Sequence, residues 1–183
     1  MAKPKAITVE LIPVERDGKR SAIYAMADAL IDSHHPHLRD ARIAFAWNLA
    51  WSEDTDGKVI LGQAKRTSDL DRELHGFDFI ILLNGEWIPN FQPEQVRAVI
   101  DHELCHCEVA KDADGEVKSD ERGRTVWRVR THDVEEFREV IARHGLYKSD
   151  LEQLAETMRD AKVPAPLFDA QKLKKQESPD AEG

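Results

Sequence analysis

Apolar residues recur at helical spacing in several stretches of the chain. In 21–35 they occupy every third or fourth position, which predicts a helix that Pro36 ends. The stretch 92–110 has the same periodicity, and Pro93 lies near its start, where a missing N–H is tolerated. The apolar face of this second helix consists of Val96, Val99, Ile100, Leu104 and Cys107. A shorter amphipathic helix is predicted over 151–158.

Three other stretches have the patterns of β-strands. Apolar residues alternate over 41–51, so one face of this strand is apolar. The unbroken apolar run in 76–84 predicts a strand that is buried on both faces, inside a sheet. The stretch 58–68 reads as a further strand and contains Gly62. We therefore expect an α+β fold, in which a small twisted sheet of three to four strands packs on the helix over 92–110, with flanking helices.

The composition places the folded part in the middle of the chain. Of the 183 residues, 41% are hydrophobic and 33% are charged, which indicates polar tails around a modest folded centre. Residues 1–20 have an extended pattern, and residues 162–183 are rich in Pro, Lys and Glu without periodicity. We expect an extended N-terminal segment over 1–20, a folded domain over 21–161 and a disordered tail over 162–183.

Charge and cysteine content exclude several classes of protein. The net charge of −9 argues against nucleic-acid binding, which depends on Lys and Arg neutralising phosphates. No run of about 18 apolar residues predicts a membrane span, and the first residues do not form a signal peptide. The two cysteines, Cys105 and Cys107, diverge on the predicted helix and imply no disulfide. The cytoplasm is the expected compartment.

The helix over 92–110 carries a motif with the spacing of a metal site. In His102-Glu103-Leu104-Cys105-His106 the two histidines are about 40° apart around a helix, so their imidazoles converge on one point. Glu103 lies off that axis, where a carboxylate addresses a water on the metal. This pattern predicts a zinc ion held by His102 and His106, with Glu103 as general base.

A catalytic zinc needs a third protein ligand, and the sequence offers three kinds of candidate. His132 precedes a predicted helix that begins near Asp133, and a histidine at the entry to a packed helix is held stiffly. Glu135 and Glu136 lie in the first turn of that helix, where the helix dipole also favours acidic residues. Asp112 follows the motif along the chain but lacks the glycine that would turn it back. We favour His132.

Three blocks of the sequence together resemble a phage-type metallopeptidase family. They are LGQAKRTSDLDRELHGFDFIILLNGEWI, QVRAVIDHELCHCEV and VWRVRTHDVEEFREVIARHGLY, and the likeness covers about residues 43–147. The resemblance implies that His102, His106 and His132 are metal ligands and that Glu103 is the base. The spacing of His132 and Phe137 also resembles that of minimal zincins of the SprT-like type.

This resemblance implies a zinc metallopeptidase with a minimal zincin-like domain. Its substrate would be a protein or peptide, in the cytoplasm of a bacterial or phage-infected host cell. In zincins an edge strand runs along the cleft, and we assign that role to 58–68. Two alternatives stay open: a zinc-stabilised protein-binding module without catalysis, and a SprT-like protease that acts on DNA, which only the arginines of 122–130 favour.

Several residues near the motif have a structural and a functional interpretation. Asp101 can hold a ligand histidine through its second ring nitrogen, or it is a solvated charge. For Cys105 we expect packing rather than metal binding. The segment His34-His35-Pro36-His37 suggests a metal cluster, but histidines are also favoured at the end of a helix, and we expect no metal there.

Overall fold

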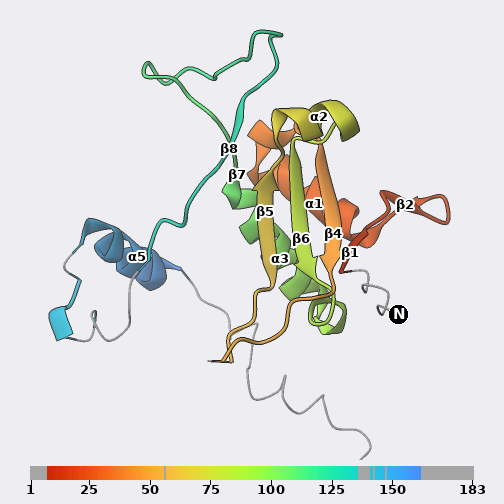
Figure 1. Cartoon of the computed structure of the whole chain (residues 1–183). Coiled ribbons are helices and arrows are strands. Elements are labelled where there is room, and N and C mark those ends of the chain that lie inside the picture. The colour runs from red at the N-terminus through yellow and green to blue at the C-terminus, as the bar shows by residue number, and fades with distance from the viewer. Residues whose placement is uncertain (1–7, 56, 136–140, 142, 147, 162–183) are drawn as a thin grey trace, which may run out of the picture. The chain divides into compact units, whose positions relative to one another are not determined.

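The computed structural model describes residues 8–55, 57–135, 141, 143–146 and 148–161. The chain divides into two compact units, Met1–Arg130 and Thr131–Gly183. The first unit contains the sheet and most of the helices, and Figure 1 shows their arrangement. The second unit contains one long described helix, α5 (Ser149–Asp160). The helix predicted over 151–158 is therefore confirmed and extends slightly at both ends.

A four-stranded mixed sheet forms the centre of the first unit, in the order β1-β4-β6-β5. Its strands are β1 (Val9–Leu11), β4 (Ile43–Asn48), β5 (Gly62–Arg66) and β6 (Phe79–Asn84). β4 and β6 are parallel, whereas β1 and β5 are antiparallel to their neighbours. The apolar run predicted an interior strand, and β6 is interior, with Phe79, Ile81 and Leu83 completely buried. β5 lies at the edge that the sequence assigned to 58–68.

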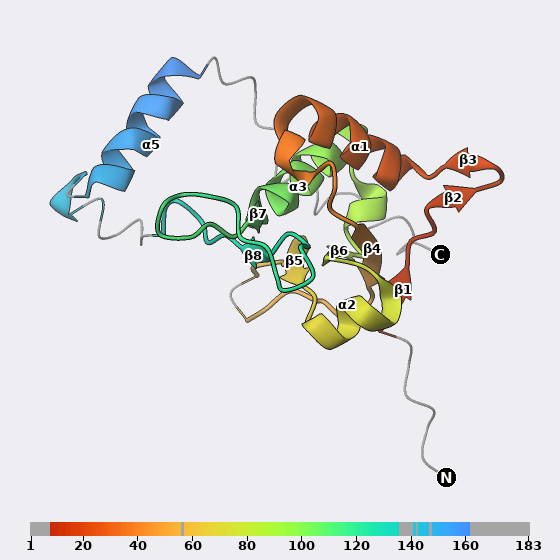
Figure 2. The same cartoon turned by 90° about the horizontal axis from the view of Figure 1, so that it is seen from above.

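Two helices, α1 (Ala22–His34) and α3 (Pro93–His106), lie side by side on one face of the sheet (Figure 2). The alternation in β4 explains this layer, because Phe45 points to the helices and its ring meets that of Tyr24 at 5.1 Å. α3 begins with a capping box between Gln92 and Gln95, followed by Pro93 at its first position. The two 3-10 turns η1 (Pro36–Leu38) and η2 (Ile88–Asn90) connect the helices to the strands.

α3 ends four residues earlier than the sequence predicts. Its last residue is His106, and Cys107–Val109 is a strand, β7, that pairs with β8 (Trp127–Val129). Cys107 continues the apolar period of the helix, but it is buried as the first residue of β7. This is why the predicted end of the helix is wrong. The motif is therefore not in the middle of a helix. It occupies the last turn of α3, where the chain changes into a strand.

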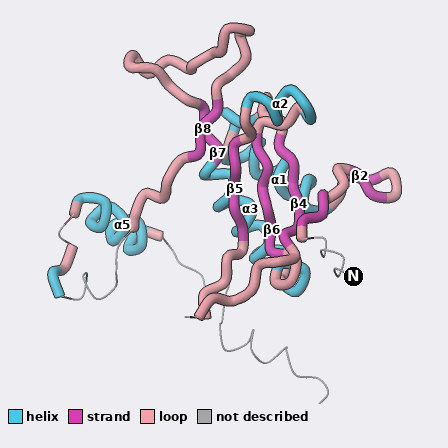
Figure 3. Tube along the Cα trace, in the orientation of Figure 1, coloured by secondary structure: helices cyan, strands magenta, loops and turns pink. Residues whose placement is uncertain are grey.

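The segment between β7 and β8 forms two tight turns and contacts α2 (Asp69–His75), a short helix that the sequence pattern did not predict. The first turn is closed by a hydrogen bond from the N–H of Gly115 to the carbonyl of Asp112. It contains the adjacent pair Asp114-Gly115, which is typical of such turns. Glu73 of α2 receives hydrogen bonds from Arg122 and Arg124 in the second turn. Figure 3 shows this segment as a long loop beyond β7 and β8. A hairpin of β2 (Glu15–Arg16) and β3 (Lys19–Arg20) precedes α1.

The α+β class and the four-stranded sheet agree with the expectation from the sequence. β1 pairs with β4, so the N-terminal segment contributes a strand to the sheet. The helix predicted from Asp133 lies mostly outside the described residues, as does the tail 162–183. None of the helices in the described part of the chain is long and apolar enough to cross a membrane.

Candidate metal centre

His102 and His106 converge in the last turn of α3. Their Nε2 atoms lie 3.3 Å apart, and their rings meet nearly at right angles, at 78°. Two imidazole nitrogens on one tetrahedral zinc ion lie about 3.3–3.4 Å apart, given Zn–N distances of about 2.0–2.1 Å. The pair therefore has the separation that one metal ion requires of two ligands.

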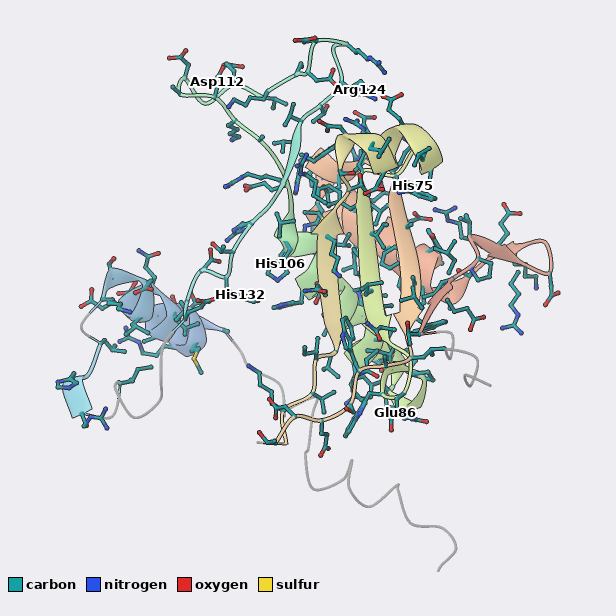
Figure 4. All side chains as sticks on the ribbon, in the orientation of Figure 1. His75, Glu86, His106, Asp112, Arg124 and His132 are labelled. Carbon is teal, nitrogen blue, oxygen red and sulfur yellow. The ribbon has the colours of Figure 1, made fainter. Side chains whose placement is uncertain are left out.

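The backbone at Arg130 fixes the tautomer of His106. Nδ1 of His106 lies 2.7 Å from the carbonyl oxygen of Arg130, which can only accept a hydrogen bond, so the ring carries its proton on Nδ1. Nε2 then keeps a lone pair for a metal. The N–H of Arg130 also donates to the carbonyl of His106, at 2.8 Å. Arg130, the residue that follows β8, thereby holds both the backbone and the ring of His106, which Figure 4 shows beside β5.

Glu103 is buried beneath the edge strand. It is 4% exposed, and its carboxylate accepts a hydrogen bond from the N–H of Ala64 in β5. Its Oε2 atom is buried and has no hydrogen-bond partner among the described residues. Burial raises the pKa of Glu103, while the neighbouring His106 and the Ala64 N–H lower it by less. A buried carboxylate with one unsatisfied oxygen and a raised pKa is suited to accept a proton.

Gly62 allows the strand to approach this carboxylate. A Cβ atom at position 62 would lie 2.5 Å from Oε1 and 2.7 Å from Cγ of Glu103. These separations are shorter than van der Waals contact, so no other residue fits without displacing the glutamate. A glycine inside a strand often marks such a close approach. Gly62 within the strand pattern of 58–68 is therefore the sequence signal for this contact.

His132 is the second residue of the second unit and lies two positions after Arg130. Its side chain is 49% exposed, and its Nδ1 atom is 3.6 Å from Oε1 of Glu135. A carboxylate on that side favours a proton on Nδ1, which leaves Nε2 for a metal. Of the other candidates for third ligand, Glu135 contacts His132, and Glu136 lies outside the described residues.

Asp112 has a different role. Its Oδ1 atom accepts hydrogen bonds from the N–H groups of Asp114 and Glu116 at 3.0 and 2.9 Å, which stabilises the turn. Figure 4 shows Asp112 at the tip of the loop, far from His106. The structure therefore does not bring Asp112 to the histidine pair.

The remaining residues near the motif differ in part from the expectation. Asp101 contacts His35 at the end of α1, at 2.7 Å, rather than a histidine of the motif. Cys107 is completely buried, as expected, and burial next to Glu103 raises the pKa of its thiol to about 12. Cys105 is exposed, so its predicted packing role is wrong. His37 donates to the carbonyl of Cys107 at 3.1 Å, and its ring lies 6.0 Å from that of His35.

A cavity of about 540 Å³ lies between β5, α2 and the turn before β8, away from the motif. Most of its charged side chains are paired with one another. Arg72 and Asp78 form an ion pair at 2.7 Å, and Arg124 pairs with both Glu73 and Asp120. Because these charges neutralise each other, we do not assign a ligand to this cavity. The chemistry of the motif lies elsewhere.

The residues of the motif fit a metal ion on two independent observations. The nitrogen pair has the required separation and one fixed tautomer, and Oε2 of Glu103 is a buried acceptor without a hydrogen-bond partner in the described part of the chain. Neutral imidazoles suit zinc and other late transition metals. The contacts that hold this arrangement, from Ala64, Gly62 and Arg130, come from the backbone, and side-chain patterns alone do not reveal them.

Comparison with known proteins identifies a family. The family described as putative phage metallopeptidase matches residues 18–162, which is most of the chain and includes the whole motif. No curated protein and no solved structure matches the chain. The resemblance seen in the three sequence blocks is thereby confirmed.

Proposed function

We propose that this chain, which belongs to the phage metallopeptidase family, is a zinc-dependent peptidase in which Glu103 is the general base. The observation that carries this proposal is the last turn of α3. There, two histidine nitrogens lie 3.3 Å apart, next to a buried glutamate with one unsatisfied oxygen. Family membership implies a metal, and the donor set favours zinc.

The proposed ligands are His102, His106 and His132. Two residues of extended chain reach about 7 Å, and the residue two positions before His132 is anchored on His106. The connection is therefore short enough to bring a third imidazole to the pair. Three histidines leave one tetrahedral position open, which is typical of catalytic rather than structural zinc. When bound, zinc supplies Lewis acidity, which polarises a carbonyl group and makes a water molecule acidic.

Glu103 moves the proton in this proposal. Oε2 accepts a proton from the attacking water, while the Ala64 N–H holds the carboxylate in place through its other oxygen. The protonated carboxyl then returns this proton to the nitrogen of the leaving amine, so one group serves both halves of the reaction. The raised pKa of Glu103 favours the protonated state that the second half requires.

The substrate is expected to be an extended segment of a protein or peptide. At the ends of the β5–β6 pair, Thr67 donates to Asp78 and Asn84 donates to Leu61. These bonds alternate along the strand, so the backbone groups of Gly62, Ala64 and Arg66 point away from β6. An extended peptide can pair through main-chain hydrogen bonds with the outward groups on either side of the Ala64 N–H, which is itself bonded to Glu103. Glu103 contacts the middle of this edge.

The substitution Glu103→Gln tests the proposed chemistry. It keeps the shape of the side chain but cannot accept the proton, so hydrolysis should fall by several orders of magnitude while zinc content stays the same. Both are measured on one preparation, by cleavage of an unfolded protein substrate and by metal analysis. Activity equal to that of the wild type would mean that Glu103 is not the base. Zinc without cleavage in the wild type would favour a binding module.

His132→Ala tests the third ligand separately. Loss of one of three ligands should weaken zinc binding by orders of magnitude, as measured by competition with a chelator. Glu135→Ala is the matched control, because it removes the neighbouring carboxylate but leaves all three imidazoles. Wild-type affinity in His132→Ala, together with weak binding in Glu135→Ala, would transfer the role to Glu135.

A further inference from the structure

α3 carries two pairs of potential metal ligands that interleave along its last turns. His102 and His106 form one pair, and Asp101 and Cys105 form the other, each with the spacing of four residues that brings side chains to one face. Because the pairs are offset by one residue, they point about 100° apart around the helix. The second pair meets a different neighbour, the residue that follows α1.

His35 completes a three-residue cluster with this second pair. Its Nε2 atom is 2.7 Å from Oδ1 of Asp101, and one potential ligand atom each of His35, Asp101 and Cys105 lie within 4.8 Å of one another. Ligand atoms around one tetrahedral zinc ion lie about 3.3–3.6 Å apart, given Zn–N and Zn–S distances of about 2.0–2.1 and 2.3 Å. The atoms of His35 and Asp101 would therefore move apart by about 0.6 Å, and a pair at the 4.8 Å limit would close by about 1.2–1.5 Å, which side-chain rotations can supply.

The backbone around His35 is held on both sides. The N–H of His35 donates to the carbonyls of Leu30 and Ile31, and its own carbonyl accepts from Leu38. The side chain is 8% exposed, so its orientation is set by the surrounding packing. A ligand held in this way needs little ordering when an ion binds. Cys105, in contrast, is exposed and gives the cluster an opening to solvent.

We propose that His35, Asp101 and Cys105 form a second metal site, separate from the His102–His106 pair, for a borderline-soft divalent cation such as Zn²⁺. Imidazole, carboxylate and thiolate are all zinc ligands, and the two negative charges of Asp101 and Cys105 neutralise the charge of the ion. Binding replaces the hydrogen bond between His35 and Asp101: the imidazole proton moves from Nε2 to Nδ1, so that Nε2 and Oδ1 both face the ion. Sγ of Cys105 binds the metal and releases its thiol proton to solvent. The ion links the end of α1 to α3 and leaves a fourth position for water.

Cobalt substitution tests this site in the full-length protein. Co²⁺ bound to a thiolate gives an intense charge-transfer absorption in the near ultraviolet, whereas Co²⁺ bound only to histidines does not. Bound metal per chain is measured after equilibrium dialysis, with the absorption recorded on the same samples. Wild type should bind one ion more than Cys105→Ser, and only wild type should show the thiolate absorption. His35→Ala should lose the same ion as Cys105→Ser, and His34→Ala, its matched control, should keep it. The two histidines are adjacent and only His35 is buried.

A variant that lacks the first histidine pair, His102→Ala/His106→Ala, keeps the two sites distinguishable. It should retain one Co²⁺ and the thiolate absorption even if the proposed peptidase function is wrong. Asp101→Asn and Cys105→Ser change exposed or half-exposed side chains and should remain folded, as circular dichroism will verify. The proposal is overturned if the wild type shows no thiolate absorption, or if Cys105→Ser keeps the wild-type metal content.

Discussion

Gly62 and Glu103 depend on each other at the scale of single residues. The strand can lie against the carboxylate because position 62 has no side chain, and the nearest atoms of Glu103 would be 2.5–2.8 Å from a Cβ there. The N–H of Ala64, two residues later, then bonds to the same carboxylate. The position of the proposed base is therefore set by a residue that carries no chemistry of its own.

Gly62→Ala should lower kcat/KM by about 10- to 100-fold, because a displacement of about 1 Å in a catalytic group has effects of that size. Metal content should stay the same, since the three atoms nearest to a Cβ at position 62 all belong to Glu103. Gly85→Ala is the matched control, because its Cβ would crowd Leu49 at 2.5 Å, away from Glu103. Steady-state kinetics and metal analysis of both variants check this. Equal losses in the two variants would indicate a general effect of crowding.

Secondary-structure elements differ in how well the sequence predicted them. α1 and β6 are buried in the core, and their burial produces the apolar patterns from which they were predicted. α2 has no buried residue, so it leaves no apolar period, although Ser68 caps it and Gly76 ends it in a left-handed conformation. The end of α3 was misplaced because Cys107 satisfies both a helical and a strand pattern.

The candidate site was predictable only to the level of its side chains. His102, Glu103 and His106 are recognisable from spacing, because i and i+4 share a helix face. Every residue has a backbone carbonyl and every residue except proline has a backbone N–H, so no sequence pattern distinguishes the carbonyl of Arg130 or the N–H of Ala64. The contact between His35 and Asp101 joins residues 66 positions apart, and only the packing of α1 on α3 creates it.

Asp120 organises the second turn between β7 and β8. Its Oδ1 atom accepts from the N–H groups of Arg122 and Arg124, and its Oδ2 atom accepts from the guanidinium of Arg124. These hydrogen bonds, led by the Arg124 N–H, lower the pKa of Asp120 to about 2. The folded turn thus favours the carboxylate over the acid.

A lowered pKa in the folded state makes the turn sensitive to acid. Asp120 stabilises the fold above the unfolded pKa of about 3.9, and this contribution is lost as pH falls from about 4 through 2. NMR titration of the Asp120 carboxyl should give a midpoint well below 3.9. In Arg124→Gln the midpoint should rise, because the guanidinium is lost while the backbone donors stay. A midpoint at 3.9 in the wild type would contradict the hydrogen bonds seen here.

Charge decides which partners suit the whole molecule. The net charge is −9, and arginines of the most basic stretch, 122–130, are paired within the first unit. Arg122 and Arg124 bind Glu73, and Arg128 binds Glu108. These pairs leave little positive potential for a phosphate backbone, which argues against the DNA-associated alternative.

We therefore expect no DNA binding at physiological salt. Fluorescence anisotropy with labelled single- and double-stranded oligonucleotides at about 150 mM salt should show no saturable change at micromolar protein. Glu73→Gln/Glu108→Gln releases the paired arginines and raises the net charge by two, so weak, salt-sensitive binding should appear first in this variant. Tight binding by the wild type that weakens steeply with salt would support the SprT-like interpretation.

The hydrogen bond between Ala64 and Glu103 also affects how the protein behaves at high concentration. An edge strand with a continuous row of outward amide groups is a template for pairing between molecules and for aggregation. In β5 the middle amide of that row is already bonded to a carboxylate of the same chain, and Lys65 and Arg66 add charge beside it. A second copy of β5 cannot pair along the full strand without breaking this bond. The residue proposed to split peptide bonds thus also keeps the sheet from growing.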